Sequence, residues 1–321
     1  MDYYNSDIID DPDYFDGFNK RFGAPIIDRS GILNDELKIL TPLLPEARPG
    51  NKFKDIVDIK AKAILERAKK QNKDIKVSYS GGIDSTLVMS ALSKIKDDYP
   101  SVKITVVMSK ESIKEYPKFF GKHINKKFPV DMANSKNLAE VLAKKNNKDF
   151  FIVTGELGDQ LFGSALMFRD AFKDKLDKDW EEVFTPKFVQ FWSDLVEENP
   201  QQDFSAANVF WWLNFVLKYQ WVQLRMFAML DGKVPLQNFI HFFGGPRFQN
   251  WAMNTDMKVK FPNLKDEKTY KMPAKKYIYD FTGDKVYLKN KTKKGSLKEN
   301  LDEPIRKNID RITEDLELIK K

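Results

Sequence analysis

The chain has 321 residues, a formal net charge of +7 and no cysteine. The absence of thiols excludes disulfides, zinc–thiolate sites, iron–sulfur clusters and cysteine nucleophiles. The two histidines, His123 and His241, are too few for a three-histidine metal site. The hydrophobic fraction of 42% is typical of a folded globular protein.

The sequence predicts a cytoplasmic protein without a membrane span. No window approaches the roughly 18 consecutive apolar residues that a transmembrane helix needs. Residues 1–16 contain six aspartates and no basic residue. A secretory signal would instead begin with a basic region followed by an apolar one.

The N-terminal part predicts an arm followed by a strand–turn–helix unit. Residues 1–50 are interrupted by prolines and glycines without sustained periodicity, so we expect an extended arm that packs on the core. Apolar residues at helical spacing predict a helix at 53–70. The β-prone run IKVSYS at 75–80 predicts a strand, and a glycine turn then leads into a helix predicted at 84–95.

The following segments repeat this alternation. Such βαβ units place their strands in a parallel sheet that is covered on both faces. We therefore predict an α/β core with an open, Rossmann-like parallel sheet over residues 51–170. The segments concerned are strands at 102–109, 128–132 and 149–156, and helices at 114–128, beyond Pro117, and at 137–146.

Beyond about residue 165, aromatic-rich helical patterns replace the alternation. They occupy residues 180–198 and 206–230, and residues 296–321 place apolar side chains on one helical stripe. We therefore predict that residues 171–321 form a mainly helical C-terminal part that completes the active site.

The turn SGGIDS at residues 80–85 predicts a phosphate-binding loop. Turns at the carboxyl ends of parallel strands are where open α/β sheets bind ligands. The two glycines permit close backbone approach, the serines add hydroxyl groups, and the next helix directs its unpaired N–H groups at the loop. Asp84 would repel a phosphate unless a cation lay between them, so its presence implies Mg²⁺.

The two common phosphate-loop patterns, G-x-x-x-x-G-K-[ST] and G-x-G-x-x-G, do not fit this turn. SGGIDS instead resembles the pyrophosphate-binding loop (PP-loop) of the N-type ATP pyrophosphatases, which cleave ATP to AMP and pyrophosphate. VTGELGDQLFGS at 153–164 resembles the SGEGxDExFGG segment of asparagine synthetases, of which β-lactam synthetases carry a variant. The resemblance spans roughly residues 55–300 and is strongest at these two motifs. It implies a PP-loop fold that binds ATP and Mg²⁺.

The resemblance assigns roles to individual residues. Asp84 and Asp159 match the carboxylates that bind Mg²⁺, and Glu156 matches the glutamate with a general-base role in amide formation. Thr154 and Gly155 match positions that flank the adenosine. Independently, two carboxylates at neighbouring strand ends can hold Mg²⁺ over a triphosphate, and a third can accept a proton from an amine. The other nucleotide-binding positions are backbone atoms near Met108, at the adenine, and Ser78, Tyr79, Ser80, Gly81, Gly82, Ile83 and Ser85.

A basic segment near the C-terminus contains a further match. KTKKGS at 291–296 resembles the RPKxGF segment, whose lysine touches the α-phosphate and the activated carbonyl. This makes Lys293 the candidate for stabilising the charge that develops in both half-reactions. Lys289, Lys291 and Lys294 are its competitors.

Two other segments match only in part. KVPLQNFIHFF at 233–243 resembles the family's RVPFLD region, and Lys218 resembles the lysine upstream of it. However, the family's KxDR reads KYQW at 218–221, so both charged residues after the lysine are lost. The resemblance therefore gives little support to aspartate as the substrate.

Together these features predict an ATP-dependent carbon–nitrogen ligase. A substrate carboxylate would attack the α-phosphorus of ATP, releasing pyrophosphate, and ammonia or an amine would then displace AMP to form an amide. Glutamine hydrolysis by a cysteine nucleophile is excluded in this chain, which has no cysteine. Nitrogen would come from free ammonia, an amine substrate or a separate ammonia-supplying protein.

Two alternatives remain open at this point. Residues 265–298 contain eleven lysines and only four acidic residues, so a PP-loop enzyme that modifies a nucleobase or nucleic acid is one. The other is a non-catalytic nucleotide-binding protein with an interaction role. The sequence does not specify the carboxylate, the amine or the oligomeric state.

Overall fold

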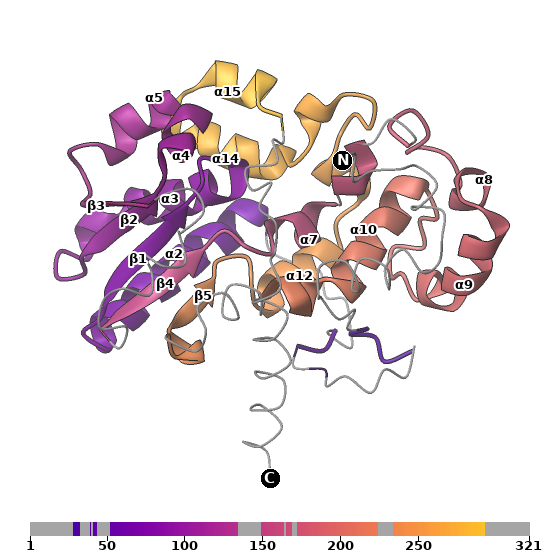
Figure 1. The fold of residues 1–321 in the computed structure, drawn as a ribbon, viewed down its shortest axis with the longest axis horizontal. Helices are drawn as coiled ribbons and strands as arrows, with labels where there is room; N and C mark the ends of the chain where they lie inside the picture. The colour runs from indigo at the N-terminus through magenta and orange to yellow at the C-terminus, as the bar shows by residue number, and fades with distance from the viewer. Residues whose placement is uncertain are drawn as a thin grey trace, which may run out of the picture.

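The computed structural model describes residues 28–32, 39, 41–43, 52–133, 149–163, 165–168, 172–223 and 234–292 (Figure 1). The helix predicted at 137–146, the C-terminal helical stripe and Lys293 lie outside these residues, as does most of the predicted arm.

Five parallel strands form one open sheet in the order β3-β2-β1-β4-β5 (Figure 1). The predicted α/β fold with an open parallel sheet is thus confirmed. Strand β4 (Phe150–Thr154) is buried along its whole length, and four of the six residues of β1 (Asp74–Tyr79) are buried, as expected for strands covered on both faces. The strands are β1 (Asp74–Tyr79), β2 (Ile104–Met108), β3 (Val130–Met132), β4 (Phe150–Thr154) and β5 (Phe239–His241).

Strand β5 is absent from the sequence-based prediction. It comes from the C-terminal half and pairs with β4, with Ile152 opposite Phe239 and Thr154 opposite His241. Three residues are too few to show a strand periodicity, and only their position beside β4 makes them a strand. The sheet therefore contains one strand from the part of the chain that we predict to be helical.

Helices α2 (Phe53–Lys70) and α3 (Ile83–Ile95) pack against each other, and α14 (Met272–Thr282) packs against both. The buried residues of α2 recur at helical spacing, so one face is apolar and the other is charged. In α3, nine of the 13 residues are buried, because this helix lies between the sheet, α2 and α14. The helix that begins at the glycine turn is thus held firmly in place.

The helix predicted at 114–128, beyond Pro117, is present in part. It consists of α5 (Pro117–Phe119) and a π-helical turn (Phe120–Ile124) and ends before residue 128. A separate short helix, α4 (Lys110–Glu115), is absent from the sequence-based prediction. Tyr116 adopts an extended backbone between α4 and α5, because the residue before a proline avoids helical geometry. The break places the end of α4 beside the glycine turn.

The C-terminal region is largely helical, as predicted. Every residue of α10 (Ala206–Leu217) is buried, and aromatic rings contact one another in stacked or edge-on arrangements around it. The described helices after β4 are α7 (Gly158–Phe162), α8 (Trp180–Val183), α9 (Pro186–Glu197), α10 (Ala206–Leu217), α12 (Pro246–Met253), α13 (Met257–Lys260), α14 and α15 (Lys285–Asn290). Among the described residues, no helix combines the length and apolar composition needed to cross a membrane.

Arg29, from the N-terminal segment, is buried in the helical region. Its guanidinium donates to the carbonyl oxygens of Thr41 (2.6 Å) and Phe215 (3.0 Å) and to the Gln249 side chain, and lies 3.9 Å from the Tyr219 ring centre. Burial lowers the pKa of Arg29 to about 10, so it is charged at neutral pH. One side chain thus fastens this segment to the helical region.

We predict that Arg29→Met lowers the free energy of unfolding by about 3 kcal/mol, because it leaves several buried acceptors without a donor. Lys54→Met is the matched control, since Lys54 forms an exposed ion pair with Asp280 and such pairs contribute at most about 1 kcal/mol. Urea unfolding monitored by tryptophan fluorescence measures both. Equal losses for the two variants would contradict the anchoring role.

Candidate functional site

The candidate site lies where the order of strands reverses. From β1, the chain continues to β2 on one side, whereas β4 lies on the other side of β1. The loops that leave the carboxyl ends of β1 and β4 therefore lie on the two sides of this reversal. In open α/β sheets such a reversal is the usual ligand site. The two sequence motifs supply these two loops.

The glycine turn after β1 has a backbone that only glycine fits. Gly81 has a φ of +79°, and a Cβ there would clash with the Ser112 carbonyl oxygen and with Glu115. The turn is also closed by its own serines. The Ser80 N–H donates to Ser85 Oγ (3.1 Å), and the Gly82 N–H donates to Ser80 Oγ (3.3 Å). This rigid turn places the N-terminus of α3 at the carboxyl end of β1.

The loop after β4 approaches the start of α3 very closely. A Cβ on Gly158 would overlap the Asp84 carboxyl group, and one on Gly155 would lie 2.9 Å from the Ser85 nitrogen. Between them, Leu157 takes a left-handed conformation with a φ of +73°. Such a backbone in a non-glycine residue is uncommon and clusters at functional sites. The close approach brings Asp84 and Asp159 together.

Lys271 joins the two aspartates. Its ammonium group donates to Asp84 Oδ2 and lies 2.8 Å from Asp159 Oδ1. The Lys271 side chain is only 2% exposed, whereas those of Asp84 and Asp159 are 23% and 36% exposed. Burial alone would lower the pKa of Lys271, but Asp159 and Asp84 raise it overall, so the ammonium stays charged. The two separate motifs therefore meet at the buried Lys271 ammonium.

Sequence reasoning missed Lys271, which lies within the lysine-rich segment outside every motif. Its backbone is left-handed, with a φ of +56°, and it directly precedes α14. Nothing in the local sequence separates it from the other lysines of that segment. Only the packing of α14 against α3 brings it to the aspartates.

The two carboxylates fit a magnesium ion that also binds a nucleotide. Mg²⁺ is typically held by one or two carboxylates together with water and substrate phosphates. No group of three or more His, Cys, Asp or Glu side chains with metal-binding geometry occurs in the described part of the chain. A nucleotide would therefore have to supply further oxygen ligands, and the adjacent turn is where its phosphates would lie.

Glu156 and Thr154 are tied to His241 by hydrogen bonds. The Glu156 N–H donates to Thr154 Oγ1 (3.3 Å), and Thr154 Oγ1 lies 2.8 Å from His241 Nδ1. His241 Nε2 lies 2.7 Å from the Gln223 carbonyl oxygen, which can only accept. His241 therefore donates from Nε2 and accepts from Thr154 at Nδ1. His241 is the last residue of β5, and its ring holds the loop that carries Glu156 through the hydrogen bond to Thr154.

Other predicted residues lie around this centre with their side chains buried. Met108 ends β2, and its carbonyl oxygen accepts from the Ala133 N–H (2.8 Å). Tyr79 stacks on Phe119, and burial raises its pKa. Ile83 also packs in the core. These residues can meet a nucleotide only through backbone atoms, whereas Ser78 of β1 is half-buried.

Lys291 lies beside the glycine turn. Its ammonium bonds to Glu115, whose side chain packs against Gly81. The Lys275 ammonium donates to the Lys291 carbonyl oxygen (3.2 Å) and so fixes the chain at this point. Lys291, a competitor to Lys293 in the sequence analysis, is thus the described lysine of the KTKKGS segment, and it is near the predicted phosphate position.

The positions that replace the family's KxDR serve packing. Lys218 caps the C-terminus of α10, and Tyr219 and Trp221 are buried. Gln220 accepts a hydrogen bond from the Thr41 N–H (3.1 Å). In this chain the segment therefore binds the N-terminal part rather than presenting charge to a ligand.

Comparison with models of known protein families and with curated proteins gives no match. The resemblance to asparagine synthetases and other PP-loop enzymes thus depends on the motifs alone.

We predict that Lys271→Met lowers the free energy of unfolding by about 2 kcal/mol without Mg²⁺, because two aspartates then repel each other without a cation. Added Mg²⁺ should restore most of this loss and raise the melting temperature of the variant more than that of the wild type.

Lys276→Met, an exposed change on the same helix, is the control and should leave stability and the Mg²⁺ response unchanged. If Lys271→Met behaved like this control, the two aspartates would not form a cation site.

Proposed function

We propose that this protein is an ATP-dependent carbon–nitrogen ligase of the PP-loop type. It would activate a substrate carboxylate as an acyl-adenylate and transfer the acyl group to ammonia or an amine. One observation carries the proposal. Asp84 and Asp159, from separate motifs, both contact the Lys271 ammonium beside a rigid glycine turn at the strand reversal.

Different residues of the candidate site would bind different parts of the nucleotide. The N–H groups of the turn and of the first residues of α3 would bind the β- and γ-phosphates. Asp84 and Asp159 would hold Mg²⁺, which supplies charge neutralisation to the departing pyrophosphate. Backbone atoms at the ends of β2 and β4 would bind the adenosine. Lys271 limits the negative charge of the two aspartates, which favours one divalent ion over two.

The chemistry has two steps. A substrate carboxylate oxygen bonds to the α-phosphorus, and the bond from that phosphorus to the bridging oxygen breaks, so pyrophosphate leaves. The amine nitrogen then bonds to the activated carbonyl carbon, its proton passes to Glu156, and the bond to the AMP oxygen breaks. Lys291 or Lys293 would stabilise the negative charge on the α-phosphate and carbonyl oxygens in both steps.

Among the described lysines of the lysine-rich segment, Lys271 and Lys275 are buried and Lys291 is paired with Glu115, whereas Lys265, Lys268, Lys276, Lys285 and Lys289 are exposed. A PP-loop enzyme that modifies nucleic acid therefore stays the alternative to this proposal. The convergence of Asp84, Asp159 and Glu156 on one pair of loops supports turnover over a purely binding role.

The first test is pyrophosphate exchange into ATP, screened across amino acids and small diacids. We expect exchange only with the correct carboxylate, and we expect Asp84→Asn to reduce it at least about 100-fold through loss of Mg²⁺ binding. Asp98→Asn, an exposed change beyond α3, is the control. Release of ADP and orthophosphate instead of AMP and pyrophosphate would overturn the proposal.

A second prediction uses variants of His241 to separate carboxylate activation from amide formation. Because His241 positions the Glu156 loop, His241→Ala should slow amide formation about tenfold or more while exchange changes less than about twofold. His241→Asn keeps an acceptor at the place of Nδ1 and should recover more activity than His241→Gln. Equal losses in both steps for all three variants would indicate a structural role only.

A further inference from the structure

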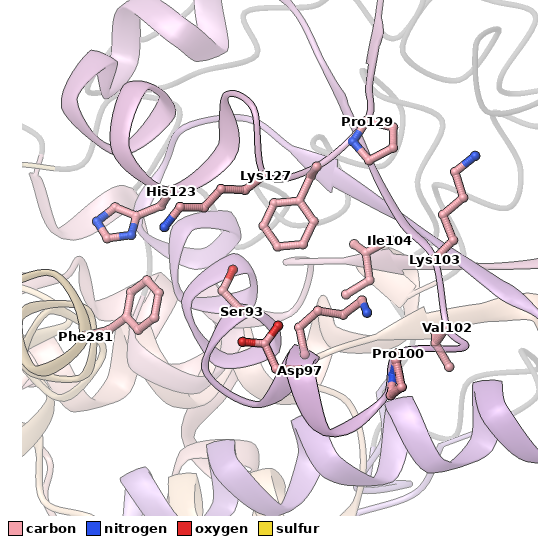
Figure 2. Close-up of a pocket in the computed structure, with 12 residues that line it drawn as sticks. Ser93, Asp97, Pro100, Val102, Lys103, Ile104, His123, Lys127, Pro129 and Phe281 are labelled. Carbon is pink, nitrogen blue, oxygen red and sulfur yellow. The ribbon is translucent and has the colours of Figure 1, made fainter.

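A cavity lies at the opposite end of the strands from the candidate site. Figure 2 shows residues that line it. It opens at the amino ends of β2 and β3, whereas the phosphate loop lies at the carboxyl ends of β1 and β4. Its volume is about 640 Å³, which is in the range of small-molecule sites. Four parts of the chain line it: the end of α3, the residues around the start of β2, those preceding β3, and Phe281 of α14.

One wall of the cavity is aromatic. The His123 ring lies 4.9 Å from that of Phe281 and 5.0 Å from that of Phe119. Burial lowers the pKa of His123, with Lys127 and Lys122 adding to the effect, so the imidazole is neutral at neutral pH. A neutral imidazole beside a phenyl ring offers a stacking surface for a planar group.

The cavity is also positively charged. Lys96, Lys103 and Lys127 line it, and among the described lining residues only Asp97 is acidic. Figure 2 shows the Lys127 ammonium beside His123, on the aromatic side, whereas Lys103 points away from it. Lys127 is therefore placed to meet an anionic group on a ligand that stacks on the aromatic wall.

We propose that this cavity is a binding site for a planar aromatic anion. The ring of the ligand stacks on His123 and Phe281, and its anionic group pairs with Lys127. The site is separate from the nucleotide site and does not depend on the proposed ligase activity.

Calorimetric titration of the full chain with naphthoate tests the proposal, with neutral naphthamide as the matched ligand. We expect one saturable naphthoate site per chain and at least about tenfold weaker binding of naphthamide. Lys127→Glu should weaken naphthoate binding at least about tenfold by reversing the charge. Lys258→Glu, an exposed change on α13, should not alter it.

Two further measurements complete the design. Phe281→Ala should also weaken naphthoate binding, and circular dichroism must show that each variant is folded. Naphthoate affinity should be the same with and without MgATP and in Asp84→Asn. Any of four results would overturn the proposal. Naphthoate does not bind, naphthoate and naphthamide bind equally well, Lys127→Glu and Phe281→Ala leave naphthoate binding unchanged, or MgATP displaces naphthoate.

Discussion

The ionic contact of Lys271 with Asp84 and Asp159 is the interaction on which the arrangement of the site depends. Two carboxylates forced together by the backbone repel each other, and removing them from water adds a further cost. A buried ammonium between them offsets both effects. The cation is provided by α14, so the start of that helix, the glycine turn and the loop after β4 form one electrostatic unit.

Glycine makes that unit sterically feasible. Gly155 and Gly158 let the loop after β4 lie directly on the start of α3, and Gly81 lets the turn lie against α4. Any side chain at these positions would separate the two aspartates or lift the turn from its support. The motifs therefore encode backbone proximity at least as much as they encode functional groups.

The proximity of Asp84 and Asp159 could be predicted from the sequence, whereas strand β5 and the position of Lys271 could not. The two aspartates follow apolar runs, and the carboxyl ends of neighbouring parallel strands lie at one edge, so their proximity follows from topology. Lys271 reaches the site only through tertiary packing. Strand β5 is too short for a periodic signal. Pro117 marks the start of a helix, as predicted, but α4 before it has six residues, too few for a helical periodicity.

Strand β5 also determines how the two halves of the molecule are coupled. Because residues 239–241 complete the sheet edge beside β4, backbone hydrogen bonds join the late part of the chain to the early part. The helical region cannot detach without opening the sheet beside β4. Loss of either half therefore exposes the core of the other, which favours a single cooperative melting transition over stepwise disassembly.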